Sequence, residues 1–233
     1  MLRRSCKNSN FYSMWLGLEG CKPRMKECLN ATQVRQILIG ITTRVMKEND
    51  KLNSMDSACG DGDFGTSMWI SFSEALKQMN LVASDDIGLI LLTFGKAIVS
   101  SAGGAAGPIF GSFFIEAGKA ARGKEEVDVT DLSRMFDAAL NRIKQQGGAK
   151  IGDKTVVDAL EPAVGALRDG AIMSTGVSQS LKNAANGARV GYEATKGIVA
   201  RHGKARYLGE QTLGYADPGA YVMTVIFEEF AKV

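Results

Sequence analysis

The sequence lacks any apolar run that could cross a membrane. Of its 233 residues, 45% are hydrophobic and 23% are charged, and no stretch approaches the ~18 consecutive apolar residues that a membrane-spanning helix needs. The apolar stretch FYSMWLGL at residues 11–18 is too short, and it lacks the small-residue cleavage site of a secretory signal. We therefore expect a globular, cytoplasmic protein with no membrane partner.

Cysteine and histidine are scarce. Three of the four cysteines (Cys6, Cys21 and Cys28) lie within the first 28 residues, and only Cys59 lies further along. This distribution provides no disulfide framework and fits a reducing compartment. A zinc site is not supported either, because the spacing of Cys21 and Cys28 matches no usual pair of zinc ligands and His202 is the only histidine.

Most of the chain also lacks an excess of positive charge. Residues 1–27 contain six Lys or Arg against two Glu, whereas residues 28–233 contain 22 basic against 23 acidic residues, a net charge of −1. The main part of the protein therefore has no composition for binding nucleic acid. We assign residues 1–28 as a basic leader and leave open whether it is a disordered tail, an organelle-targeting peptide or sequence upstream of a true start at Met25. Residues 29–233 are expected to form one domain.

The period-2 alternation typical of a β-sheet is missing as well. Apolar residues instead recur at helical spacing, which predicts an all-α protein of eight helices whose apolar faces form the core. The helical segments are 34–45, 68–79, 87–99, 109–117, 132–143, 156–167, 181–194 and 222–230. Only the run 87–99 could instead be a buried strand, and it is long for one. Helix starts are indicated by Asn30 or Thr32, by Thr130 with Ser133, and by Ser178.

Glycine, by contrast, is abundant. The 27 glycines cluster at 60–65, 103–111, 147–152 and 203–219, between the predicted helices. Because glycine interrupts helices and permits unusual backbone conformations, we predict that these four clusters are helix junctions.

The first junction, DSACGDGDFGTS at residues 56–67, concentrates negative charge. Gly60 and Gly62 would allow Asp56, Asp61 and Asp63 to converge. Converging carboxylates repel one another, so either a hard divalent cation neutralises them or the segment is a pair of ordinary Asp-Gly turns. A calcium loop of the EF-hand type is excluded because an apolar residue stands where the bidentate glutamate belongs. Magnesium fits better, since it takes few carboxylates and leaves positions for water and phosphate oxygens.

The other junctions carry groups that suit a phosphate. In SSAGGAAGPIFG at 100–111, hydroxyls and flexible backbone precede Pro108, which indicates either an anion site at a helix start or a tight helix crossing. The segment GGAKIGDKT at 147–155 resembles a P-loop, but Asp153 separates the glycine from the lysine and no strand precedes it, so we reject that interpretation. Possible phosphate contacts in the last junction are Arg201, Lys204 and Arg206.

Two single residues receive no chemical role. His202 lies in a basic loop with no serine or cysteine partner identifiable nearby, so a surface position is favoured over a catalytic one. Cys59 lies between Ala58 and Gly60, where a small buried residue is favoured over a nucleophile.

Four motifs, taken in order, resemble those of the L subunit of dihydroxyacetone kinase, the nucleotide-binding half of that kinase. They are LNSMDSACGDGDFGTSM, SSAGGAAGPIFGSFF, IGDKTVVDALEPA and GKARYLGEQTLGYADPGA, and the resemblance covers roughly residues 30–233. Four ordered motifs are far more specific than any one of them. The resemblance implies a closed barrel of eight antiparallel helices with the nucleotide in the loops at one end.

The resemblance also implies ligands. Asp56, Asp61 and Asp63 would hold two magnesium ions that bridge the phosphates of ADP or ATP. The residues that match the family's nucleotide contacts are Phe64, Gly65, Thr66, Ser67, Ser100, Ser101, Gly103, Gly104, Thr155, Arg206, Asp217, Pro218 and Gly219. The acceptor, dihydroxyacetone or a related keto-sugar, would be held covalently on a histidine of a separate K subunit, so this chain would be half of a kinase.

The phosphoryl donor and the alternatives follow from the same resemblance. Stand-alone L subunits keep ADP bound and are recharged by a phosphohistidine protein of the phosphotransferase system, whereas fused versions use free ATP; the chain length favours the first scheme. We also expect a homodimer. Three positions depart from the family, with Phe64 and Tyr215 in place of histidine and Gln211 in place of arginine. The alternatives are a domain of a fatty acid kinase and a non-catalytic nucleotide-sensing adaptor. The loss of a polar contact at Phe64 favours the adaptor.

Overall fold

Helices make up most of the described part of the protein. The computed structural model describes residues 27–104 and 106–233, so the predicted leader lies outside the described residues except for Glu27 and Cys28. The α-helices within this range are α1 (Ala31–Lys47), α2 (Asn49–Ser57), α3 (Phe64–Asn80), α4 (Ile87–Ser101), α5 (Ala106–Ala120), α6 (Val129–Gly147), α7 (Val156–Ile172), α8 (Val177–Ala194) and α9 (Pro218–Phe230). Two 3₁₀ helices, η1 (Thr195–Gly197) and η2 (Lys204–Thr212), separate α8 from α9. The all-α prediction is confirmed.

Each of the eight predicted segments lies in a helix, but the sequence did not predict α2. This helix is short and polar, and Leu52 is its only buried residue, so it has no apolar stripe. The predicted cap Asn30 is confirmed, since its side chain accepts a hydrogen bond from the backbone of Gln33. The other two predicted caps are wrong: Asp128 caps α6, and the residue before α8 is a glycine without a capping side chain.

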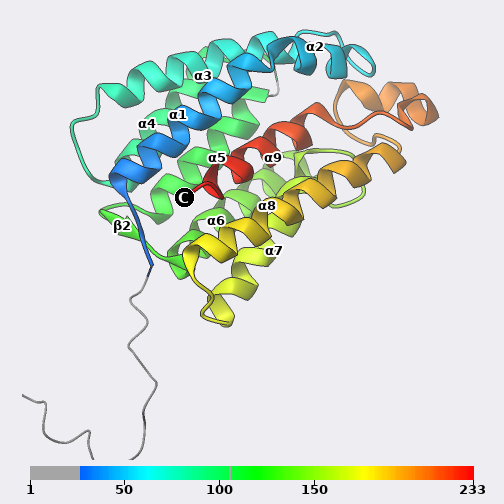
Figure 1. The fold of residues 1–233 in the computed structure, drawn as a ribbon. Coiled ribbons are helices and arrows are strands. Elements are labelled where there is room, and N and C mark those ends of the chain that lie inside the picture. Colours follow the sequence, from blue (N-terminus) through cyan, green and yellow to red (C-terminus); the bar gives the residue numbers. More distant parts are fainter. Residues whose placement is uncertain (1–26, 105) are drawn as a thin grey trace, which may run out of the picture.

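The eight long helices form a closed ring. From α3 to α9, each helix contacts the next along the chain, and α1 contacts both α3 and α9, which joins the first helix to the last. Successive long helices run in opposite directions (Figure 1), so α3, α5, α7 and α9 all begin at the same end of the ring. We call this the junction end; it is formed by residues 58–63, 102–104, 148–155 and 195–217.

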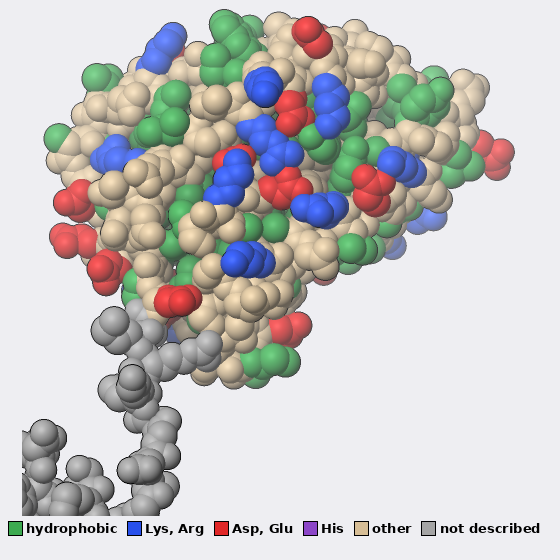
Figure 2. Space-filling view, in the orientation of Figure 1, with side chains coloured by type: hydrophobic (Ala, Val, Ile, Leu, Met, Phe, Trp, Pro, Cys, Tyr) green, Lys and Arg blue, Asp and Glu red, His purple; other side chains and the backbone are tan. Residues whose placement is uncertain are grey.

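Ion pairs close the ring where α1 meets α8 and α9. Arg44 of α1 lies 2.5 Å from Glu228 of α9, and Arg189 of α8 lies 2.8 Å from the same carboxylate. Figure 2 shows basic and acidic side chains interspersed on this face of the molecule. Gly40 lets α1 and α9 approach each other, because a Cβ atom there would lie 2.6 Å from Oε2 of Glu229. Opposite charges and close packing therefore hold the first and last helices together.

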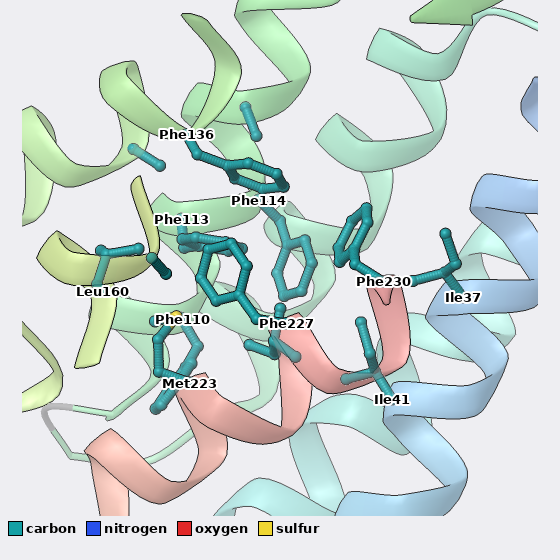
Figure 3. Packing of buried hydrophobic residues seen from close by; sticks show 14 of the residues in the cluster. Ile37, Ile41, Phe110, Phe113, Phe114, Phe136, Leu160, Met223, Phe227 and Phe230 are labelled. Carbon is teal, nitrogen blue, oxygen red and sulfur yellow. The ribbon is translucent and has the colours of Figure 1, made fainter. Parts of the chain in front are cut away.

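Phenylalanine rings fill the interior of the ring. Figure 3 shows rings from α5, α6 and α9 pointing toward one another. Phe113 and Phe136 stack at 14° with centroids 5.3 Å apart, and Phe227 meets both rings edge-on. Such pairs add to the stability that burial of the rings provides. The predicted apolar faces are therefore core, but some apolar residues of the predicted segments are exposed, including Trp69, Leu89 and Val99 at 43% each and Val190 at 61%.

Glycines bring α4 and α5 into backbone contact. A Cβ atom at Gly95 would lie 2.7 Å from the carbonyl oxygen of Gly111, and one at Gly118 would lie 2.8 Å from that of Gly88. Side chains at these positions would push the helices apart. The tight helix crossing that was one interpretation of residues 100–111 is therefore present at Gly111.

The described chain starts and ends away from the junction end. The C-terminus and the start of α1 lie near each other (Figure 1), where Leu29 of β1 (Leu29–Asn30) pairs with Val127 of β2 (Glu126–Val127). This two-residue antiparallel pairing anchors the start of the domain to the connection between α5 and α6. Across the described residues, no helix combines the length and the apolar character that crossing a membrane requires.

The glycine contacts predict opposite effects for two matched substitutions. Gly95→Ala should lower the free energy of unfolding by about 1–3 kcal/mol, because the added methyl group overpacks the α4–α5 crossing. Gly165→Ala on α7 should raise it by about 0.5–1 kcal/mol, because a Cβ atom there meets nothing within 4 Å and alanine favours helix. Urea denaturation monitored by circular dichroism would measure both values. Shifts of the same sign would contradict this account of the crossing.

Candidate functional site

A cavity of about 690 Å³ opens at the junction end. Its lining includes the first residues of α3, α7 and α9 and residues of the first turn of α5. The backbone N–H groups at these four helix starts have no partners within their own helices, and the helix dipoles add positive potential there. The topology therefore provides an environment that favours an anion before any side chain is considered.

Three carboxylates converge on one side of this cavity. Asp56 lies in the last turn of α2, and Asp61 and Asp63 lie in the loop that leads into α3. One oxygen from each carboxylate lies within 4.8 Å of the others. Gly60 and Gly62 make this possible: a Cβ atom at Gly60 would lie 2.4 Å from Oδ1 of Asp56, and Gly62 has a φ of +77° and donates its N–H to Oδ2 of Asp56. Such a set of hard oxygen donors fits a divalent cation such as Mg²⁺.

Lys204 faces the carboxylates from the start of η2. Its ammonium group pairs with Asp61, which raises the pKa of Lys204 and lowers that of Asp61. Arg201, Lys204 and Arg206 were all possible phosphate contacts, and Arg206 was the one that matched a nucleotide contact of the family. Arg206 does not line the cavity, and its guanidinium lies 4.6 Å from the ring centroid of Tyr207. The spacing of the basic residues could not show which of them turns inward.

The second junction contributes backbone rather than hydroxyls. Gly103 and Gly104 line the cavity, and nothing lies within 4 Å of a Cβ atom built on either. Ser100 and Ser101 do not line it; both hydroxyls donate to the carbonyl of Ala97, at 3.0 and 2.6 Å. The anion-site interpretation of this junction therefore applies to its two exposed glycines.

The start of α3 divides into cavity-facing and packing residues. Phe64 and Ser67 line the cavity. Gly65 packs against α2, where a Cβ atom would lie 2.2 Å from the carbonyl oxygen of Asn49. Thr66 also faces α2, because its backbone N–H and its hydroxyl are both bonded to the side chain of Asn53. The predicted residues 65 and 66 therefore shape the loop without lining the cavity.

A buried lysine joins the third junction to the last one. Lys154 lines the cavity but is only 4% exposed, and its φ of +61° is uncommon for a residue other than glycine. Its ammonium group donates to the carbonyl of Thr195, at 2.7 Å, and to that of Tyr215. Burial lowers the pKa of Lys154. The next residue, the predicted Thr155, lines the cavity and caps α7.

The turn Asp217–Pro218–Gly219 lines the cavity and starts α9. Asp217 caps the helix by accepting the N–H of Ala220 at 2.7 Å, and Pro218 occupies the first helical position. Burial raises the pKa of Asp217 to about 7; the negative charge of Asp158 adds to this effect, while the hydrogen bond from Ala220 and the charge of Lys154 oppose it.

The rest of the cavity wall is mainly apolar. It was not predicted, because apolar residues at helix ends resemble ordinary core positions in a sequence. The residues are Ala106, Pro108, Ile109, Ile143, Ala149, Val156 and Val157, with Gln146 and Gly147 beside them. A cavity with charged groups on one side and apolar groups on the other suits a ligand that combines phosphates with an aromatic ring.

Two residues without an assigned role also line the cavity. Cys59 was expected to be a small buried residue, but it is half-buried and lines the cavity; burial raises the pKa of its thiol, which does not favour a nucleophile. His202, expected at the surface, lies in the cavity wall with Nε2 3.2 Å from Oδ2 of Asp153. A lone histidine in a basic loop gave no signal for this contact.

Comparisons with known proteins agree with the motif resemblance. The family model of the DAK2 domain matches residues 58–232. The ADP-binding subunit DhaL of the PEP-dependent dihydroxyacetone kinase of Escherichia coli is 35% identical over 82% of this chain and 91% of its own length. The ADP-binding subunit DhaL of PEP-dependent dihydroxyacetone kinase 2 of Listeria innocua is 34% identical over 81% of this chain and 89% of its own length.

A solved structure shares the fold. The dihydroxyacetone kinase of C. freundii, crystallised in complex with AMP-PNP and Mg²⁺, matches this chain with a TM-score of 0.68 at 23% identity. The match covers 100% of this chain but only 38% of that kinase. This chain therefore has the fold of one part of a longer protein.

The raised pKa of Asp217 predicts a pH-dependent stability. The folded state holds this proton up to about pH 7, whereas an unfolded aspartate releases it near its ordinary pKa of 3.8, so the contribution of Asp217 to stability is lost as the pH rises toward 7. Asp217→Asn keeps a capping oxygen and removes the titration. We expect the unfolding free energy of the variant to fall less between pH 5 and pH 8, measured by urea denaturation without ligands. Parallel pH profiles of the two proteins would exclude this effect.

Proposed function

The chain belongs to the DAK2 domain family, and we propose that it is the nucleotide-binding subunit of a kinase for dihydroxyacetone or a related keto-sugar. The relatives from Escherichia coli and Listeria innocua are named as ADP-binding subunits of such kinases and align over most of their length. One observation carries the proposal: a single cavity combines three converging carboxylates, four helix starts and an apolar wall.

The three aspartates are the proposed metal ligands. Carboxylate oxygens are the protein ligands that Mg²⁺ prefers, and phosphate oxygens complete its coordination in nucleotide sites. Asp56, Asp61 and Asp63 would hold two Mg²⁺ ions beside the phosphates of ADP or ATP. When bound, the ions offset the charge that the phosphoryl group carries through a loose transition state. Support comes from the mutual distances of the carboxylate oxygens, all within 4.8 Å.

The nucleotide would lie across the cavity from its charged side to its apolar side. The backbone of Gly103 and Gly104 and the ammonium group of Lys204 would receive the phosphates, and the apolar wall would receive the base. Direct contacts are proposed for the predicted residues that line the cavity: Phe64, Ser67, Gly103, Gly104, Thr155, Asp217, Pro218 and Gly219. A supporting role in loop structure is proposed for Gly65, Thr66, Ser100 and Ser101.

The acceptor and the donor would come from other proteins. We propose that a separate K subunit carries the keto-sugar to the cavity, and that a phosphohistidine protein of the phosphotransferase system recharges ADP, a scheme that the description "PEP-dependent" of the relatives supports. The segment 204–215 beside the cavity exposes apolar side chains that suit a protein contact: Tyr207, Leu208, Leu213 and Tyr215. A cytoplasmic location and a homodimer stay predictions from the sequence.

Asp61→Asn tests the metal-dependent nucleotide site. The substitution should reduce Mg²⁺-dependent ADP binding by at least about tenfold, because it removes a charged ligand from the ions. Isothermal titration calorimetry would measure the affinity, and circular dichroism should show unchanged helicity because Asp61 is exposed. Asp85→Asn, an exposed aspartate in the loop between α3 and α4, is the matched control and should bind as the unmodified protein does. Unchanged affinity of the Asp61 variant would rule out the proposed site.

Leu213→Asp tests the proposed contact with the K subunit. Leu213 is 44% exposed and does not line the cavity, so the variant should bind Mg·ADP normally. A charge in the contact should lower phosphoryl transfer to dihydroxyacetone by at least about tenfold when the K subunit is limiting. Ile172→Asp is the control, since Ile172 is 80% exposed at the last residue of α7, far from the cavity. Equal rates for the two variants would refute the assignment of this surface.

A further inference from the structure

The single histidine of the chain lies between the cavity and a buried carboxylate. His202 lines the cavity, and its Nε2 atom lies 3.2 Å from Oδ2 of Asp153. The side chain of Asp153 is 4% exposed against 34% for His202, and Asp153 is not part of the cavity wall. Asp153 is therefore the more buried of the two side chains, and of this pair His202 alone lines the cavity.

Asp153 is fixed from several directions. Its Oδ2 atom accepts the backbone N–H of Lys150 at 2.9 Å, and its own N–H donates to the carbonyl of Lys150 at 3.2 Å. Its carbonyl accepts the N–H of Arg201 at 3.1 Å, which joins the loop 148–155 to the residue before His202. A carboxylate held in this way orients an imidazole through one ring nitrogen and leaves the other nitrogen free to act. Among the described residues this contact is the one ion pair of the imidazole, and Oδ1 of Asp153 also lies 3.7 Å from Nη1 of Arg201.

His202 lies in the same loop as Lys204, which pairs with an acidic residue of the cavity. Gly203 follows it with a φ of +63°, and Lys204 comes next and reaches Asp61. His202 and Lys204 line the same cavity as the three carboxylates that are the proposed metal ligands. The charged groups that surround this part of the cavity are Asp153, Lys154, Arg201 and Lys204 from the two adjoining loops, Asp56, Asp61 and Asp63 from the acidic loop, and Asp217 from the start of α9.

We propose that the imidazole of His202, oriented by Asp153, donates a hydrogen bond to a phosphate oxygen of the bound nucleotide, and that nucleotide binding is coupled to uptake of a proton by this ring. The inference rests on the proposed function, because it requires a nucleotide in the cavity. With a buried carboxylate on one side and a phosphate on the other, the ring meets negative charge at both nitrogens in the complex. Both contacts favour the protonated form.

The test compares variants at position 202. Isothermal titration calorimetry would measure the affinity for Mg·ADP at about pH 6 and about pH 8 for the unmodified protein, His202→Gln and His202→Lys. The ratio of the affinity at the lower pH to that at the higher pH should be about five- to tenfold larger for the unmodified protein than for the Gln variant. This is the size expected for one charge-assisted hydrogen bond. The Lys variant, which has a fixed charge, should keep its affinity at the higher pH. Because burial raises the pKa of Asp217, which lines the same cavity, to about 7, some pH dependence should be common to all three proteins.

A second measurement reports the proton directly. Titrations near neutral pH in buffers of different ionisation enthalpy give the number of protons taken up with the nucleotide, and this number should be smaller for His202→Gln than for the unmodified protein. Asp153→Asn, with its fold checked by circular dichroism, should lose part of the same uptake. Equal pH ratios and equal proton uptake in the unmodified protein and the Gln variant would overturn the inference.

The same series separates this inference from the proposed function. If Asp61→Asn abolishes Mg·ADP binding while His202→Gln leaves the pH ratio unchanged, the nucleotide site stands and the role of His202 is refuted. If Asp61→Asn binds Mg·ADP as the unmodified protein does, the proposed function fails, and the inference about His202 fails with it.

Discussion

Repulsion among three carboxylates is the constraint on which the site depends. Asp56, Asp61 and Asp63 converge because two glycines let the loop before α3 fold tightly, and this concentration of charge requires compensation. The fold supplies part of it through Lys204 and through the positive ends of four helices that begin at the same end of the ring. Because successive helices run in opposite directions, the topology that builds the core also places four positive helix ends at the site.

The sequence predicted the features that depend on local patterns. Apolar stripes of 12 or so residues identified eight helices, since a helix that borders the core must repeat apolar residues at its own period. The acidic loop was also visible, because Asp56, Asp61 and Asp63 lie close together among glycines, although their spacing alone left a pair of ordinary Asp-Gly turns open. The short helix α2 was missed because it buries only Leu52, and its start follows directly on the end of α1.

Features that depend on the orientation of side chains could not be predicted. Lys204 and Arg206 lie in one basic segment, yet one turns to the carboxylates and the other stacks on Tyr207. Lys154 reads as a solvated charge in the sequence, but in the structure it is buried and donates to two backbone carbonyls. Its left-handed backbone conformation costs energy that the surrounding contacts must offset, which is common at functional sites. Only the packing of three loops against one another determines these positions.

The positions of the start of α1 and the end of α9 matter for any larger assembly. α1 begins and α9 ends on the side of the ring away from the cavity (Figure 1), and the 13 residues of α9 alone span roughly 20 Å. A domain joined directly before α1 or after α9, or a tag or surface tether attached there, starts roughly that far from the cavity. A covalently joined partner must therefore reach back along the outside of the barrel through a linker of suitable length, whereas an independent partner can approach the open rim directly.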